Sequence, residues 1–147
     1  MQDKIRILYV DDSETDRELI LHEFKKYESE FEITAVANKK DFEEKLLSNK
    51  YDIILSDYYI LGVNAHDICD YIKQMNLDIP VIVITGTGSE QIAVDLMRRG
   101  VSDYVIKSSS HIKKLPDSIK IVLQNRQNII DKKKAEKNLQ IIYKNIK

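Results

Sequence analysis

The sequence has few residues of the kinds that break secondary structure or cross-link a chain. Its 147 residues include 4 glycines, 2 prolines, 1 cysteine and no tryptophan. Glycine and proline together make up about 12% of an average protein, so their scarcity here disfavours collagen, flexible linkers and sandwiches with many turns. The lone cysteine, Cys69, excludes an intrachain disulfide. We therefore expect long helices and a chain held together by its hydrophobic core.

Charge of one sign and long apolar runs are also missing. The 23 Lys and Arg residues nearly balance the 24 Asp and Glu residues, so no overall field favours nucleic acid or an anionic membrane. The apolar runs are far shorter than the about 20 residues that span a bilayer, and the N-terminus has no signal-peptide pattern. We expect a cytoplasmic protein of one domain, with neither a nucleic-acid partner nor a membrane span within this chain.

Short apolar runs rich in β-branched residues alternate with segments of helical periodicity. Such runs predict strands, and apolar residues three and four apart predict helices. The predicted strands are residues 5–10, 31–37, 52–55, 80–84 and 102–106, and the predicted helices are residues 14–27, 39–47, 65–75, 89–99 and 116–147. A loop of about eight residues is expected after the third strand. Five strand–helix units with continuous apolar strands predict an α/β protein, in which helices cover both faces of a parallel sheet.

Polar side chains follow four of the five predicted strands at the point where each strand ends. They are Asp11 and Asp12 after the first strand, Asp57 after the third, Thr85 after the fourth and Lys107 after the fifth. Five strands are too few for a (βα)₈ barrel, so the sheet is expected to be open and doubly wound, with ligands bound beyond the carboxyl ends of its strands. Three carboxylates in one crevice repel one another, and Mg²⁺ fits them best because it takes oxygen ligands. Lys107 and Thr85 are suited to an anionic oxygen, so the crevice is expected to receive a phosphoryl group.

Four segments carry a specific resemblance to a known family. They are Ile-Leu-Tyr-Val-Asp-Asp at 7–12, Asp-Ile-Ile-Leu-Ser-Asp at 52–57, Val-Ile-Thr-Gly at 83–86 and Gly-Val-Ser-Asp-Tyr-Val-Ile-Lys at 100–107. Over about residues 4–126, the sequence resembles the receiver domain of two-component response regulators. This resemblance implies a flavodoxin-like (βα)₅ fold with strand order 2-1-3-4-5. It also implies a domain that accepts a phosphoryl group and slowly hydrolyses it, rather than a separate turnover enzyme.

The resemblance implies a role for each matched residue. Asp57 would be the phosphoacceptor, which attacks the phosphorus of a phosphohistidine on a histidine kinase or phosphotransfer protein. Asp12, Asp57 and the main-chain carbonyl of Tyr59 would ligate Mg²⁺, or Mn²⁺ in its place, with Asp11 acting chiefly through water. Lys107 would pair with a phosphoryl oxygen.

Two further residues would form a switch. Thr85 would move toward the phosphoryl group, and Tyr104 would swing inward to fill the vacated space. One departure from the family pattern affects the neighbouring loop: Ser108 stands where a proline usually follows Lys107, so a cis Lys-Pro bond is unavailable. We therefore expect a trans peptide there.

The predicted final helix is too long for a small domain. Residues 116–147 would extend about 48 Å at 1.5 Å per residue, against a domain breadth of about 30 Å. Ile119, Val122, Leu123, Ile129 and Ile130 can supply one packing face, and an a/d-type seam follows at Ala135, Leu139, Ile142 and Ile146. We expect a receiver domain at 1–126 and a helical extension at 127–147 that can form a homodimer. The extension resembles linkers that join receivers to PAS or histidine-kinase modules in hybrid signalling proteins.

Two other functions stay open. A flavodoxin-type cofactor binder would need a phosphate loop after the first strand, where Asp11 and Asp12 would repel the FMN phosphate. A pseudo-receiver, which binds partners without being phosphorylated, is compatible with the missing proline after Lys107 but not favoured by the intact Asp57 and Thr85.

Overall fold

A five-stranded parallel sheet forms the centre of the computed structural model, which describes residues 3–60, 63–86 and 90–146. The strands lie in the order β2-β1-β3-β6-β7. Their bounds are β1 Ile5–Val10, β2 Phe31–Val36, β3 Ile53–Asp57, β6 Val81–Thr85 and β7 Asp103–Ile106. Because β6 and β7 are the fourth and fifth predicted strands, the predicted fold class and the order 2-1-3-4-5 are both confirmed.

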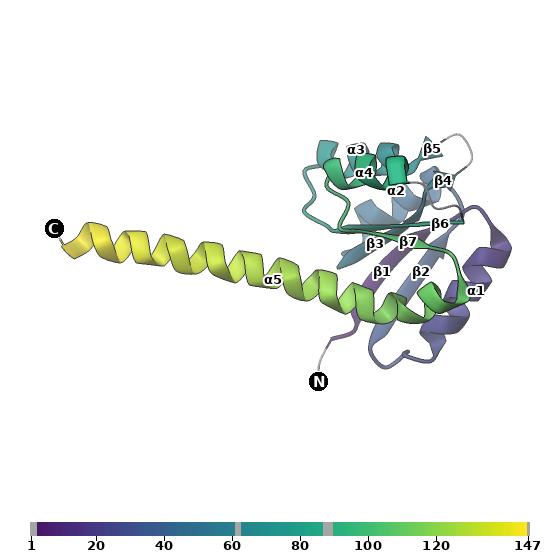
Figure 1. Ribbon diagram of the computed structural model, residues 1–147, viewed down its shortest axis with the longest axis horizontal. Helices are drawn as coiled ribbons and strands as arrows, with labels where there is room; N and C mark the ends of the chain where they lie inside the picture. Colours follow the sequence, from purple (N-terminus) through teal and green to yellow (C-terminus); the bar gives the residue numbers. More distant parts are fainter. Residues whose placement is uncertain (1–2, 61–62, 87–89, 147) are drawn as a thin grey trace.

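Helices cover both faces of this sheet (Figure 1). One face carries α2, α3 and α4, and the other carries α1 and α5, with bounds α1 Glu14–Lys25, α2 Lys39–Ser48, α3 Ala65–Gln74, α4 Glu90–Arg98 and α5 Ser109–Ile146. Strand β1 shows why two layers form, since alternate side chains of a strand point to opposite faces. Leu8 and Val10 belong to the core cluster under α2, α3 and α4, whereas Ile7 and Tyr9 belong to the cluster under α1 and α5.

The junction of β1 and α1 places the first polar residues of the sheet edge. Ser13 is the N-cap of α1, and its hydroxyl accepts a hydrogen bond from the backbone N–H of Asp16 at 3.3 Å. Such a cap satisfies one of the helix's free N–H groups. Three residues therefore separate the strand from the helix, and Asp11 and Asp12 lie in this short connection at the carboxyl end of β1.

Two elements differ from the prediction by more than one or two residues. The segment after β3 contains a small antiparallel hairpin, β4 Tyr59–Ile60 with β5 Val63–Asn64, where only a loop was expected. Helix α5 begins at Ser109 rather than at Pro116. A proline inside a helix destabilises it by about 3 kcal/mol, but burying a large apolar side chain contributes about 1.5–3 kcal/mol. Ile112, Leu115 and Ile119 are all buried around Pro116, so packing outweighs the proline.

Helix α5 projects far beyond the sheet (Figure 1). Its 38 residues extend about 57 Å at 1.5 Å per residue, and Val122 is its last buried residue. Ile129 and Ile130 are 55% and 41% exposed, so the packing face expected from Ile119 to Ile130 is buried only as far as Val122. The predicted ends at Ser89 and Lys147 lie outside the described residues. Among the helices described, none is long and apolar enough to cross a membrane.

Candidate functional site

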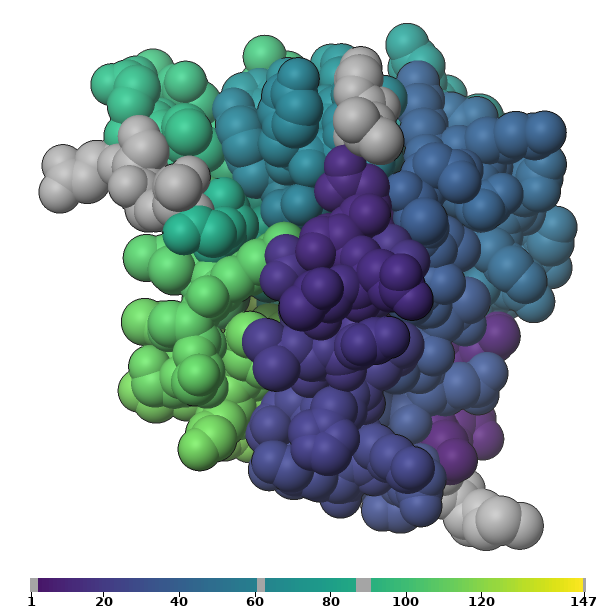
Figure 2. All heavy atoms as spheres, turned by 90° about the vertical axis from the view of Figure 1, so that its right-hand side faces the viewer, coloured from purple at the N-terminus to yellow at the C-terminus, as the bar shows by residue number. Residues whose placement is uncertain are grey.

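The carboxyl ends of four strands bring the predicted polar residues together. Asp57 is the last residue of β3 and pairs in register with Ile84 of β6. The backbone N–H of Lys107 donates to the Thr85 carbonyl at 2.7 Å, which places the end of β7 beside the end of β6. Figure 2 looks onto this face, with α1 in dark purple at its centre and the first turns of α5 in green beside it.

Three carboxylates form the centre of the site. Asp11, Asp12 and Asp57 each offer an oxygen, and these oxygens all lie within 4.8 Å of one another. Asp11 is fully buried, Asp12 is half-buried and the Asp57 side chain is 13% exposed. Clustered carboxylate oxygens are the donors that a hard divalent cation takes. The trio therefore fits Mg²⁺ by its donor chemistry, as the sequence predicted.

Asp11 is held by groups that the sequence analysis did not identify. The Tyr9 hydroxyl donates to Asp11 Oδ2 at 2.6 Å, and the Ser13 backbone N–H donates to Oδ1 at 3.0 Å. Arg17 Nη1 donates to the Asp11 carbonyl at 2.7 Å. Burial, and then the hydrogen bond and negative charge of Asp11, raise the pKa of Tyr9 far above its usual value, so Tyr9 stays a neutral donor. The two-residue spacing of Tyr9 and Asp11 could have indicated this contact, because side chains two apart in a strand share one face.

Lys107 is the cation of the site. Its Nζ lies 2.8 Å from Asp11 Oδ2, 2.8 Å from Asp16 Oδ2 and 3.3 Å from Asp57 Oδ1, and its side chain is 9% exposed. Burial lowers the pKa of this ammonium, but hydrogen bonds to Asp11 and Asp16 and the nearby negative charges outweigh burial and raise it overall. Asp16 was not among the predicted site residues. It comes from the first turn of α1, 91 positions from Lys107.

Asp57 has an unusual acidity for an aspartate. Burial, and then the negative charge of Asp11, raise its pKa from 3.8 to about 6, although Lys107 opposes both effects. At neutral pH the carboxylate is therefore ionised, but at an energetic disadvantage that a cation relieves. An ionised carboxylate facing an ammonium beside a cation site is equipped to attack an electrophilic phosphorus.

Residues 7–120 match the response regulator receiver domain. The chain belongs to this family. Receiver domains receive a phosphoryl group from histidine kinases in two-component systems, and they are not separate turnover enzymes. Both points agree with what the resemblance implied.

Individual relatives agree with this assignment. The response regulator ArlR of Staphylococcus saprophyticus is 37% identical over 90 residues, which cover 60% of this chain and 40% of ArlR. SaeR of Staphylococcus aureus is 35% identical over 104 residues, which cover 71% of this chain and 44% of SaeR. The chain thus spans less than half the length of these relatives.

Solved structures agree on the fold. The signal receiver domain of a LuxO repressor protein from Vibrio parahaemolyticus is similar with a TM-score of 0.77 at 26% identity, over 88% of this chain and 96% of that one. The chemotaxis response regulator CheY4 of Vibrio cholerae gives 0.71 at 17% identity, over 82% of this chain and 99% of that one, a likeness in fold.

The expected switch residues of this receiver domain lie in the two strands that follow β3 in the sheet order, β6 and β7. Thr85 is 6% exposed at the end of β6, and Tyr104 in β7 is half-buried against the core cluster under α2, α3 and α4. The Tyr59 side chain in β4 is 63% exposed, and its carbonyl stays a predicted metal ligand. Among the described residues every peptide bond is trans, including Lys107–Ser108 as expected.

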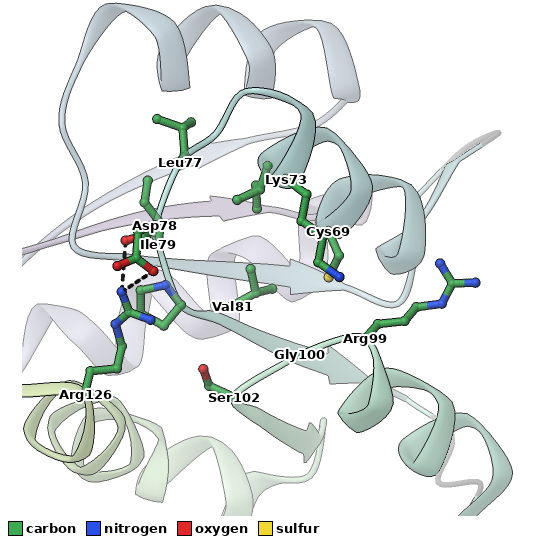
Figure 3. Close-up of a pocket in the computed structure, with 12 residues that line it drawn as sticks. Cys69, Lys73, Leu77, Asp78, Ile79, Val81, Arg99, Gly100, Ser102 and Arg126 are labelled. Atoms are coloured by element: carbon green, nitrogen blue, oxygen red, sulfur yellow. Dashed lines mark hydrogen bonds and ion pairs between the residues drawn. The ribbon is translucent and has the colours of Figure 1, made fainter. Parts of the chain in front are cut away.

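A pocket of about 210 Å³ lies at the other end of the sheet (Figure 3). Its lining includes Val81 at the start of β6 and Ser102 before β7, so it opens away from the carboxylates of the receiver site. Cys69 lines it too, and burial raises the pKa of this thiol, which keeps the sulfur protonated and unreactive. Arg126 of α5 pairs there with Asp78 at 2.8 Å. This pocket shares no lining residue with the carboxylate trio.

Proposed function

We propose that this receiver domain accepts a phosphoryl group on Asp57, from a phosphohistidine of a histidine kinase or phosphotransfer protein, in a reaction that depends on Mg²⁺. One observation carries the proposal: the Asp57 carboxylate faces the Lys107 ammonium at 3.3 Å and lies within the acidic trio. The proposed nucleophile, the positive charge opposite it and the proposed cation ligands thus lie together at the edge of the sheet.

The side chains would divide the chemistry among them. An Asp57 oxygen forms a bond to phosphorus as the P–N bond of the donor phosphohistidine breaks. Asp12, Asp57 and the Tyr59 carbonyl would hold Mg²⁺, or Mn²⁺, with Asp11 acting through water. The bound ion would neutralise charge on the transferring group. The Lys107 ammonium would hold a phosphoryl oxygen by a charge-assisted hydrogen bond.

The response would spread through the switch residues. A phosphoryl group shifts a protein between two states only by contacts that differ between them. The Thr85 hydroxyl would supply one such contact by moving toward the phosphoryl group, and Tyr104 would then move inward into the space that Thr85 leaves. Since Tyr104 lies in β7 between α4 and α5, the change would reach the surface that these three elements share.

We further propose that residues 127–147 act as a helical extension of the receiver domain at 1–126. Leu139, Ile142 and Ile146 are 63%, 55% and 76% exposed on the projecting part of α5, and with Ala135 they form an a/d-type seam. This seam would pair with a second copy and lead to a neighbouring module, as in hybrid histidine kinases with PAS modules.

Light scattering of full-length variants tests the dimer. The double variant Leu139→Ser and Ile142→Ser should be monomeric where the wild type is dimeric. Ile141→Ser is the matched control, because Ile141 is 49% exposed but lies off the seam. A double variant that keeps the wild-type mass would move the interface away from the extension.

Intact-mass spectrometry tests the phosphoacceptor role. The wild type, incubated with acetyl phosphate and Mg²⁺, should gain one phosphoryl group, and Asp57→Asn should gain none. Asp52→Asn is the control, since Asp52 is an exposed aspartate at the opposite end of β3. Absence of an adduct on the wild type, with Mg²⁺ binding shown separately and a phosphohistidine donor also tried, would contradict the proposal and favour the pseudo-receiver.

A further inference from the structure

Lys107 contacts three carboxylates that are not equivalent. An ammonium has three N–H donors, and here three carboxylates lie within 3.3 Å of Nζ. Two of them, Asp11 and Asp57, belong to the acidic trio, whereas Asp16 does not. Three side-chain partners of Lys107 are observed in the described residues. Asp16 is the one among them that lies outside the cluster suited to a cation.

The two kinds of partner respond differently to a divalent cation. When Asp11 and Asp57 turn their charge toward such an ion, their hold on Lys107 weakens, and the two positive groups repel each other. Asp11 is also committed to Tyr9 and Ser13, which occupy both of its oxygens. Asp16 Oδ2 lies 2.8 Å from Lys107 Nζ. The hydrogen bonds from Tyr9 and Ser13 go to the oxygens of Asp11 and not to this oxygen.

Asp16 is itself well placed to serve as an anchor. Its backbone N–H donates to the Ser13 hydroxyl at the N-terminus of α1, where a negative side chain is favoured by the helix dipole. Its side chain is 35% exposed, so its carboxylate avoids the large desolvation penalty of full burial. Helix α1 is fixed to the sheet by buried Ile20 and Phe24, which gives the anchor a rigid base.

We propose that Asp16 is a positioning residue, which keeps the Lys107 ammonium over Asp57 while Asp11 and Asp57 serve a divalent cation. The proposal rests on the proposed function, because its purpose is to have the ammonium in place for a phosphoryl oxygen. The side-chain partner of Asp16 observed in the described residues is Lys107. Asp16 acts on the reaction only through Lys107.

Accessibility of Lys107 is the first test and does not depend on phosphorylation. Lysines are labelled with trace acetic anhydride, with and without saturating Mg²⁺, and peptide mass spectrometry compares Lys107 with Lys113, which is exposed on α5. Asp16→Asn should raise the relative labelling of Lys107 about tenfold in Mg²⁺, the effect of losing one charge-assisted hydrogen bond, and much less without it. Glu14→Gln, which removes an exposed acid from the same helical turn, should change neither value.

Phosphorylation by acetyl phosphate is the second test. Asp16→Asn should slow adduct formation on Asp57. The same substitution in a Lys107→Ala background should have no further effect, because this double-mutant cycle isolates the coupling between Asp16 and Lys107. Labelling of Lys107 that stays equally low in Asp16→Asn with Mg²⁺ would overturn the proposal. So would equal slowing in both backgrounds. A wild type that forms no adduct with acetyl phosphate or with a phosphohistidine donor, while its labelling follows the expected pattern, would instead refute the proposed function.

Discussion

Replacing Asp57 with asparagine should stabilise the protein in the absence of metal. The pKa of Asp57 is raised from 3.8 to about 6, by burial first and by the charge of Asp11 second. The native state thus binds this proton more tightly than the unfolded chain does, so stability is greatest below the unfolded pKa and is lost as pH rises through about 6. At 1.36 kcal/mol per pKa unit, the ionised side chain destabilises the native state by up to about 3 kcal/mol at pH 7.5.

Asparagine has the shape of aspartate without the charge, so it removes this destabilisation. We expect the free energy of unfolding of Asp57→Asn to exceed that of the wild type by up to about 3 kcal/mol, a figure that already includes the opposing contact with Lys107. For a chain of this size, each 1 kcal/mol raises the Tm by about 2–4 °C. At pH 4, where the wild-type carboxyl is mostly protonated, the two proteins should differ much less.

Urea unfolding followed by far-UV circular dichroism, in EDTA and again in Mg²⁺, provides the measurement. Added Mg²⁺ should stabilise the wild type by mass action and Asp57→Asn far less, because one of the carboxylates is gone. Asp52→Asn serves as the control for an exposed aspartate. The reasoning would be refuted by an Asp57→Asn protein that is no more stable than the wild type in EDTA at pH 7.5.

Three further outcomes are expected. Apparent Mg²⁺ affinity, measured by calorimetry, should fall about tenfold from pH 7.5 to pH 5, because at one unit below a pKa of about 6 only about a tenth of Asp57 is ionised; a constant affinity would count against a cation bound by this carboxylate. Tyr9→Phe removes the 2.6 Å donor of the buried Asp11 Oδ2 and leaves the Lys107 ammonium at 2.8 Å as its observed partner, which should destabilise the protein to urea by about 1 kcal/mol, whereas no change would mean that the contact with Lys107 is sufficient for this oxygen. Phe42→Ala, at a fully buried position of α2, should lower the unfolding free energy by about 3–5 kcal/mol, and Leu47→Ala, at a 61% exposed position of the same helix, by less than about 0.5 kcal/mol.

Local patterns in the chain were enough for the fold and for most of the site. Strand β1 was predicted at residues 5–10 as observed, since a short β-branched run that ends at two aspartates and a capping serine leaves little choice of structure. Parallel strands carry their carboxyl ends on one edge. The convergence of Asp57, Thr85 and Lys107 therefore followed from strand ends alone.

Other features depend on contacts between residues that are distant in the chain. Pro116 predicts a helix start, but the buried neighbours Ile112 and Ile119 extend the helix through it, because packing energy exceeds a local preference. Asp16 could be recognised only as an ordinary first-turn acid until α1 and β7 were docked on the same sheet and its carboxylate met Lys107. The raised pKa of Asp57 likewise arises from burial and from Asp11, which are properties of the folded surroundings and not of the residue. Local preference and periodicity act over a few positions, whereas burial and charge pairing act across the whole fold.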